Sequence, residues 1–122
     1  MAKQIMIVDD DRDILEFMYL MLAYEGYDVL VSTTAEEIQQ MRPSDLPDLI
    51  LLDVKLAEQD GRVICQRLKT NEQTKDIPII MLSAHVTERQ VRQVCPADDF
   101  IAKPFALETL YAKVGKQLPE HS

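Results

Sequence analysis

The sequence predicts an α/β fold in which crossover helices connect the strands of a parallel sheet. Short apolar runs alternate with longer segments of helical periodicity along the whole chain, which is the pattern of repeated strand–helix units. Residues 49–52 are four large apolar residues in a row, as in a strand buried on both faces in the middle of a parallel sheet. Residues 5–8 have the same character. Both runs lead directly into aspartates, so carboxylates are expected to converge at one edge of the sheet.

Length and charge limit the classes of function. The 122 residues suffice for a core on both faces of one sheet, so we expect a single domain over residues 1–122. The formal net charge of -8 argues against direct binding to nucleic acid or to an anionic membrane. No apolar run approaches the roughly 20 residues of a spanning helix, and no leader pattern opens the chain, which predicts a cytoplasmic protein. Cys65 and Cys95 lack a metal-binding spacing and are expected to be plain thiols.

Three strands and two helices are expected in the first half of the chain. The strands are predicted at residues 4–8, 27–31 and 49–52. Asp28 indicates that the second strand lies at an edge of the sheet. The first helix has an apolar face at helical spacing, and Gly26 ends it. That face consists of Ile14, Phe17, Met18, Met21 and Leu22. Thr34 and Glu37 are spaced as a capping box, which would open a short second helix that ends before Pro43.

Two strands and three helices are expected in the second half. The strands are predicted at residues 77–82 and 100–102. A long turn over residues 54–59 leads to Asp60, the expected N-cap of the third helix. The buried stripe of that helix is Gly61, Ile64, Cys65 and Leu68. Thr87 and Gln90 form a second capping box, which opens a short fourth helix that Pro96 ends. The stripe of the last helix is Leu107, Leu110, Val114 and Leu118.

Every predicted strand except the second ends in a functional group. These groups are Asp9 and Asp10, Asp53, Ser83 and Lys103. Because the carboxyl ends of parallel strands lie along one edge of a sheet, the groups are expected to meet. Converging carboxylates can hold a hard cation such as Mg²⁺, and a central carboxylate can act as a nucleophile toward phosphorus. A hydroxyl and an ammonium can bind the phosphoryl oxygens that result. Asp11, by contrast, is most simply the N-cap of the first helix.

Together these motifs resemble the receiver domain of two-component response regulators. The resemblance covers nearly the whole chain. It runs in order through Asp9-Asp10, residues 49–52 with Asp53, Asp60-Gly61, Ser83-Ala84 and Lys103-Pro104-Phe105. It implies a flavodoxin-like (βα)5 three-layer sandwich, in which a parallel five-stranded sheet has the order 2-1-3-4-5. It also implies a cis peptide bond between Lys103 and Pro104.

The resemblance further implies a metal site and a phosphoacceptor. Asp53 would receive the phosphoryl group. Asp10 would bind Mg²⁺ directly, and Asp9 would hold a metal-bound water. Asp53 itself and the backbone carbonyl of Lys55 would complete the set of metal ligands.

The family also implies how phosphorylation changes the conformation of the domain. Lys103 would pair with the phosphoryl oxygens, and Ser83 would donate a hydrogen bond to one of them. Movement of Ser83 toward the phosphoryl group would vacate space for the ring of Phe100, and the region around the fourth and fifth strands would repack. Because Phe has no hydroxyl, the ring of Phe100 is expected to favour the inward position.

Partners follow from the same resemblance. The phosphoryl donor would be a sensor histidine kinase or a histidine phosphotransfer protein, and the recipient of the signal an unidentified effector or output domain. The domain would not be an enzyme, beyond catalysing its own phosphorylation and dephosphorylation. Any dimer is expected to be weak or to depend on phosphorylation.

Three features depart from the family pattern. Ala57 stands where a Pro commonly rigidifies the turn after the phosphoacceptor, which predicts a more mobile turn. Pro96 replaces a Gly, so the chain there cannot adopt a positive φ. The span from Ser83 to Lys103 is short, which predicts a truncated fourth helix.

Other interpretations of the acids agree less well with the sequence. A hydrolase that acts through an aspartyl phosphate would need an acid two residues after the nucleophile, where this chain has Lys55. A flavin or nucleotide domain would need a Gly-rich loop after the first strand, and an EF-hand would need Gly where Ile14 stands. A docking module on the same fold that works without phosphorylation remains open.

Overall fold

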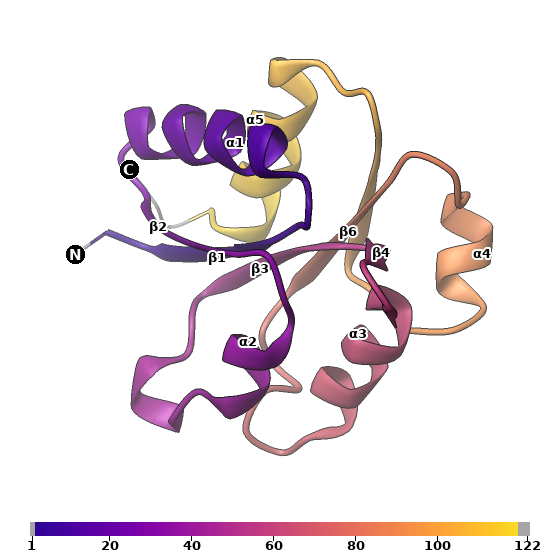
Figure 1. Cartoon of the computed structure of the whole chain (residues 1–122). Helices are drawn as coiled ribbons and strands as arrows, with labels where there is room; N and C mark the ends of the chain where they lie inside the picture. The colour runs from indigo at the N-terminus through magenta and orange to yellow at the C-terminus, as the bar shows by residue number, and fades with distance from the viewer. Residues whose placement is uncertain (1, 120–122) are drawn as a thin grey trace.

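The computed structural model describes residues 2–119 and contains a five-stranded parallel sheet (Figure 1). Its strands are β1 (Gln4–Val8), β2 (Asp28–Ser32), β3 (Leu49–Asp53), β6 (Ile79–Ser83) and β7 (Asp99–Ala102). They lie in the order β2-β1-β3-β6-β7, and every neighbouring pair is parallel. Because β4 and β5 form a separate hairpin, this order is the predicted 2-1-3-4-5. The flavodoxin-like fold is therefore confirmed, and β2 is an edge strand as Asp28 indicated.

Helices cover both faces of the sheet. Figure 1 shows α1 (Arg12–Tyr24) and α5 (Leu107–Gln117) on one side, and α2 (Glu36–Gln40) and α3 (Gly61–Thr70) on the other. The short α4 (Glu88–Arg92) lies beside α3, and a single 3-10 turn spans Pro43–Asp45. None of the helices within residues 2–119 has both the length and the apolar composition needed to cross a membrane.

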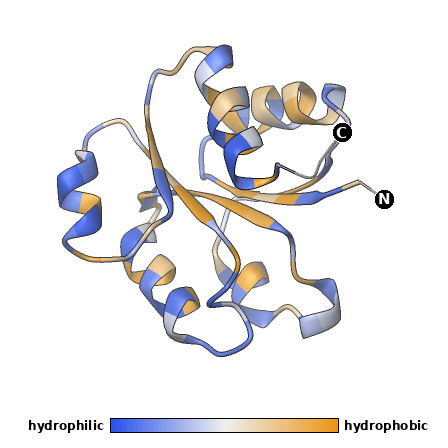
Figure 2. Ribbon diagram, turned by 180° about the vertical axis from the view of Figure 1, so that it is seen from behind, coloured by the Kyte–Doolittle hydropathy of each residue, from blue (hydrophilic) through white to orange (hydrophobic). Residues whose placement is uncertain are grey.

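The sheet separates two hydrophobic clusters. Successive residues of a strand point to opposite faces, so neighbours in the sequence join different clusters. Thus Ile7 packs with α1 and α5, whereas Val8 packs with α2 and α3. Figure 2 shows the strands as the most hydrophobic part of the ribbon, with hydrophilic residues on the outer faces of the helices. All five residues of β3 are buried, which agrees with its predicted central position.

The inner face of α1 is shifted from the predicted one, since Leu15 is buried and Phe17 is not, while Ile14 and Met21 are half-buried. The buried positions are Leu15, Met18 and Leu22, which are spaced i, i+3 and i+7. Phe17 is 44% exposed, so its assignment to the core was wrong. A helix turns by about 100° per residue, and a residue next to Met18 therefore points well away from the sheet. Leu15, on the other flank of Met18, is buried instead, so the inner face is rotated slightly from the predicted one.

The ends of the helices confirm three of the four expected caps. Asp11 caps α1, Asp60 caps α3, and Thr87 with Gln90 forms the capping box of α4. The capping box predicted for α2 is absent. Its N-cap is Ala35, which makes no side-chain hydrogen bond. The Ser32 hydroxyl instead forms a local turn with the backbone of Thr34, and the helix begins one residue later than predicted. The truncation of α4, which has five residues, is confirmed.

The segment predicted as a long turn contains a small hairpin. Its strands, β4 (Lys55–Leu56) and β5 (Gln59–Asp60), pair in antiparallel fashion around a turn formed by Ala57 and Glu58. Ala57 has a φ of 51°, in the left-handed region. Two-residue hairpin turns usually show themselves by Gly, Asn or Asp, and neither turn residue is one of these. The sequence therefore carried no sign of the hairpin.

Candidate functional site

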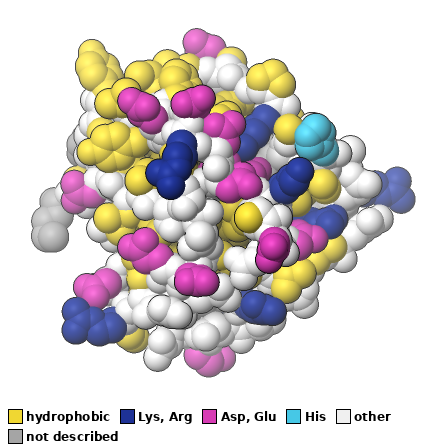
Figure 3. Space-filling view, in the orientation of Figure 1, with side chains coloured by type: hydrophobic (Ala, Val, Ile, Leu, Met, Phe, Trp, Pro, Cys, Tyr) yellow, Lys and Arg dark blue, Asp and Glu magenta, His cyan; other side chains and the backbone are white. Residues whose placement is uncertain are grey.

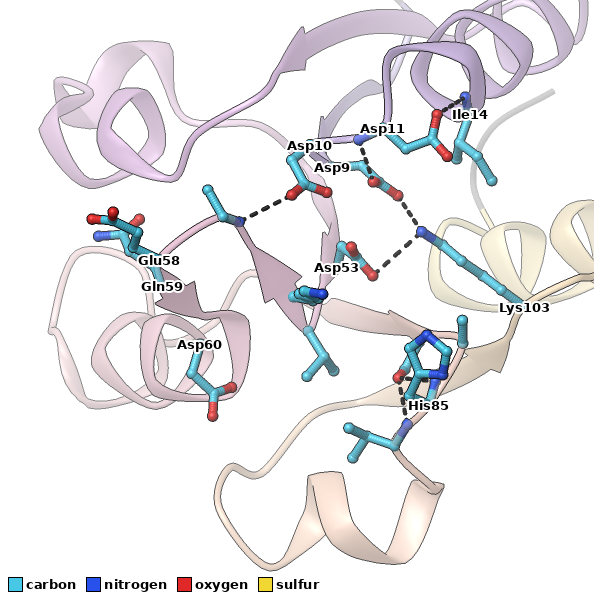
Figure 4. Close-up of a pocket in the computed structure, with 16 residues that line it drawn as sticks. Asp9, Asp10, Asp11, Ile14, Asp53, Glu58, Gln59, Asp60, His85 and Lys103 are labelled. Carbon is cyan, nitrogen blue, oxygen red and sulfur yellow. Dashed lines mark hydrogen bonds and ion pairs between the residues drawn. The ribbon is translucent and has the colours of Figure 1, made fainter.

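Three carboxylates converge at the carboxyl edge of the sheet. Asp9 directly follows β1, Asp53 is the last residue of β3, and these two strands are hydrogen-bonded neighbours. One oxygen from each of Asp9, Asp10 and Asp53 lies within 4.8 Å of the others. Figure 4 shows the three side chains directed toward one space. Asp9 and Asp53 are buried, whereas Asp10 is exposed. The convergence that the sequence predicted is present.

The ammonium group of Lys103 reaches into this cluster. Lys103 follows β7, and its Nζ lies 2.6 Å from Oδ2 of Asp9 and 3.3 Å from Oδ1 of Asp53 (Figure 4). Burial by itself would lower the pKa of the Lys103 ammonium, but the hydrogen bonds and negative charges of Asp9 and Asp53 together outweigh it, so that pKa is raised. The Lys103–Pro104 peptide bond is cis, as the resemblance implied.

The charges of the cluster do not balance. Burial first, and then the neighbouring charge of Asp9, raise the pKa of Asp53 to about 6, although Lys103 acts in the opposite direction. With all three carboxylates ionised, one ammonium leaves an excess of two negative charges. A proton on Asp53 removes part of this excess, and a divalent cation removes all of it. The donors are oxygens only, which suits a hard cation such as Mg²⁺, so the residues present are compatible with such a site.

Ser83 lies on the neighbouring strand and is tied to the loop that follows it. It is the last residue of β6 and is buried, and its carbonyl accepts the backbone N–H of Lys103 at 2.8 Å. Its Oγ accepts the backbone amides of Val86 at 2.8 Å and His85 at 3.2 Å. Phe100, in β7, is 8% exposed, so its ring is already buried in this structure. Any movement of the Ser83 hydroxyl would disturb the start of the loop that leads to α4.

The acids and Lys103 line a cleft of about 570 Å³. Figure 3 shows acidic side chains gathered around the middle of this face, with Lys or Arg side chains among them. The hairpin forms one wall of the cleft, to which Lys55 contributes an exposed side chain. Asp11 turns away to cap α1, and Asp60 pairs with Arg62 at 2.8 Å, so neither acid joins the cluster. Both residues are helix N-caps, as the sequence predicted.

One contact of the site was not foreseen. The backbone N–H of Ala57 donates a hydrogen bond to Oδ2 of Asp10 at 3.0 Å (Figure 4). Nearly all residue types have a backbone N–H, so the sequence does not indicate which amide will contact Asp10. Only the hairpin brings it to the acids.

Comparison with known proteins decides the family. A family model described as the response regulator receiver domain matches residues 5–115. The chain belongs to this family. Response regulator MprA of Mycobacterium ulcerans is 38% identical to this receiver over 116 residues, which cover 93% of the receiver and 49% of MprA. The receiver chain thus spans about half the length of that relative.

Solved structures of receivers have the same fold. A putative response regulator of Chloroflexus aurantiacus superposes with a TM-score of 0.88 at 33% identity, covering 98% of this chain and 99% of that one. The receiver domain of the sensor histidine kinase PA1611 of Pseudomonas aeruginosa superposes with a TM-score of 0.86 at 23% identity, covering 98% and 99%. In that structure a magnesium ion is coordinated in the active site cleft.

Proposed function

We propose that this receiver accepts a phosphoryl group on Asp53 in a Mg²⁺-dependent reaction, with a phosphohistidine of a sensor kinase or a phosphotransfer protein as donor. The observation that carries the proposal is the position of Asp53, whose carboxylate lies beside those of Asp9 and Asp10, where a cation could bind, and 3.3 Å from the ammonium of Lys103. A nucleophile flanked in this way has positive charge on both sides of an incoming phosphoryl group. We further propose that residues 1–122 act as one receiver domain, with no catalysis beyond its own phosphorylation and dephosphorylation.

In this phosphoryl transfer the protein mainly has to hold the reacting and charged groups in position. An oxygen of Asp53 would attack phosphorus while the P–N bond of the phosphohistidine breaks, and the imidazole would leave with the electron pair of that bond. Bound Mg²⁺ would offset the charge of the phosphoryl oxygens. Its ligands would be Asp10, Asp53 and the Lys55 carbonyl, with Asp9 holding a metal-bound water. The magnesium ion in the active site cleft of the PA1611 receiver supports the presence of a cation site at this edge of the sheet. Lys103 would pair with a phosphoryl oxygen.

The test is transfer from a small phosphodonor. We expect incubation with acetyl phosphate and Mg²⁺ to add the mass of one phosphoryl group to the intact protein, and EDTA to prevent it. Asp53→Ala should gain no such mass. Asp76→Ala, which removes an exposed aspartate from the loop after α3, should be modified like the wild type. An unmodified wild type, or an adduct that persists in Asp53→Ala, would favour a docking module that works without phosphorylation.

In the proposed mechanism, Ser83 transmits the phosphorylation of Asp53 to the loop before α4. The Ser83 hydroxyl would turn to the phosphoryl group, and the amides of His85 and Val86 that now bond to its Oγ would lose that partner. Since the Phe100 ring is already buried, the response would be a repacking of a buried ring and not its burial. The loop before α4 would move with the Ser83 hydroxyl. An effector, or a second copy of the receiver in a weak dimer, would recognise this change.

This readout predicts a loss of response in Ser83→Ala. The variant should still be phosphorylated on Asp53, because within the described residues the Ser83 hydroxyl forms no hydrogen bond with the three acids. Its phosphorylation-induced NMR shift changes around Phe100 and Val86 should fall by more than half. Ser44→Ala, at an exposed position of the 3-10 turn, is the control that should respond fully. Equal shift changes in Ser83→Ala and the wild type would remove Ser83 from the mechanism.

A further inference from the structure

One hydrogen bond joins the turn of the β4–β5 hairpin to the acidic cluster. The amide of Ala57 donates to Oδ2 of Asp10, although 47 positions separate the two residues in the chain. The other two acids are fixed by different means, because both are buried and both contact Lys103. Asp10 is exposed, and an exposed carboxylate without a partner samples several rotamers. The Ala57 amide thus holds the one acid of the cluster that burial does not hold.

The bond leaves Asp10 able to bind a cation. Within residues 2–119, the Asp10 side chain accepts its hydrogen bond through Oδ2, and Oδ1 accepts none. A carboxylate has about four acceptor positions on its two oxygens, so one N–H donor still leaves most of them open. In this same orientation an Asp10 oxygen lies within 4.8 Å of oxygens from Asp9 and Asp53. The amide therefore does not compete with a metal ion for the whole carboxylate.

Residue 57 makes this contact only because it is not proline. Proline has no backbone N–H, and its ring fixes φ near -65°, whereas Ala57 has a φ of 51°. That left-handed conformation is unfavourable for any residue with a Cβ atom. The surrounding structure tolerates it, and the result is an N–H that points at Asp10.

We propose that Ala57 is a positioning residue for the divalent cation, because its amide fixes the Asp10 carboxylate with an oxygen directed at the shared site. The inference rests on the proposed Mg²⁺ site. The hairpin also carries Lys55, whose carbonyl is a proposed ligand, so the cation and the closed hairpin favour each other. By thermodynamic reciprocity, a hairpin that strengthens cation binding is itself stabilised when the cation binds.

The sharpest test removes the N–H and keeps the rest of the residue. Ala57 can be replaced by lactic acid, so that an ester oxygen stands where the amide was and the side chain stays. Ligation at Cys65 joins the synthetic segment 1–64 to the remainder of the chain. We expect isothermal titration with Mg²⁺ to give an affinity about three- to tenfold weaker than that of the wild type. Ala57→Gly keeps the amide and should bind Mg²⁺ within about twofold of the wild type.

The failures of the two proposals differ. An ester variant that binds Mg²⁺ as tightly as the wild type overturns the role of Ala57 and leaves the metal site intact. A wild type that binds no Mg²⁺ overturns the metal site, and the role of Ala57 with it.

A measurement on the wild type does not depend on the folding of any variant. Saturating Mg²⁺ should slow hydrogen exchange of the Ala57 amide by at least about threefold in NMR spectra, since the ion holds Asp10 against it. Exchange that stays unchanged while Mg²⁺ shifts are seen at Asp53 overturns the inference.

Discussion

Lys103→Met should lower the free energy of unfolding of the metal-free protein by about 3 kcal/mol at pH 7.5. The ammonium lies 2.6 Å from an oxygen of Asp9, which is fully buried, and 3.3 Å from one of Asp53. Without it, three neighbouring carboxylates have no positive partner among the contacts of residues 2–119. Removing one member of a buried ion pair is far more costly than removing the pair, because the remaining charge stays out of water. Urea unfolding followed by far-ultraviolet circular dichroism in EDTA measures the difference.

The deficit of Lys103→Met should depend on pH. An acid whose pKa is higher in the folded than in the unfolded protein binds its proton more tightly when folded, so stability rises as pH falls through the folded pKa. Asp53 is such an acid, with its pKa raised from 3.8 to about 6. Lys103 opposes this rise, so the pKa of Asp53 should rise further in the variant. We therefore expect the deficit to shrink as pH falls from about 7.5 to 5.5, and added Mg²⁺ to stabilise the variant more than the wild type.

A second lysine serves as control for the same substitution. Lys113 on α5 bonds Asp99 at 3.0 Å, but its side chain is 32% exposed. Lys113→Met should therefore cost about 1 kcal/mol and show little dependence on Mg²⁺. Equal losses in the two variants, or a Lys103→Met deficit that is the same at both pH values, would show that the acids do not depend on the Lys103 ammonium.

Gly61→Ala should destabilise the protein by about 2–3 kcal/mol and displace the phosphoacceptor. Gly61 begins α3 directly behind Asp53, and its amide donates to the carbonyl of Val54 at 2.6 Å. A Cβ at this position would overlap the carbonyl oxygen of Asp53 and lie 2.9 Å from its carbonyl carbon. These are backbone atoms, so no side chain can move aside. The backbone of Asp53 must shift, and phosphorylation by acetyl phosphate should slow along with the loss of stability.

Gly115 provides the matched control. It lies inside α5, and apart from the adjacent residues and the nearby backbone of its own helix no atom would come within 4 Å of an added Cβ. Gly115→Ala should therefore stabilise the protein by about 0.5–1 kcal/mol, because Ala favours the helix, and leave phosphorylation unchanged. Urea unfolding of both variants checks the pair. A Gly61→Ala protein as stable as the wild type would mean that α3 can retreat from Asp53 without loss.

The sequence was most informative where residue chemistry and periodicity act together. Buried strands that lead into Asp9 and Asp53 indicated the position of the acids, because parallel strands share one carboxyl edge. The order of the strands followed from the resemblance to receiver domains. The stripe of α3 was predicted correctly, because Gly61, Ile64, Cys65 and Leu68 lie on one face of the helix, while the adjacent Val63 is exposed. On α1, Phe17 and Leu15 are both apolar, and periodicity alone could not choose between faces that differ by a small rotation.

Contacts made by the backbone could not be predicted. The Ala57 amide and the turn at Ser32 act through N–H groups and hydroxyls whose partners depend on the path of the chain. Thr34 has the spacing of a capping residue, but the hydroxyl of Ser32 competes for the same local backbone groups. The hydrogen bonds of the Ser32 hydroxyl and those of a capping box at Thr34 have similar free energies, so residue type alone does not show which of them forms.

The division of the interior by the sheet has a consequence for how related receivers can diverge. Phe100 packs in the cluster that includes Val91 and Cys95, whereas the next residue, Ile101, packs with α1 and α5. Substitutions beneath α1 and α5 therefore do not remove the packing partners of the Phe100 ring in the other cluster. We expect the residues beneath α1 and α5 to vary among related receivers, at some cost or gain in stability. The residues around Phe100 should vary less in receivers whose output depends on movement of its ring.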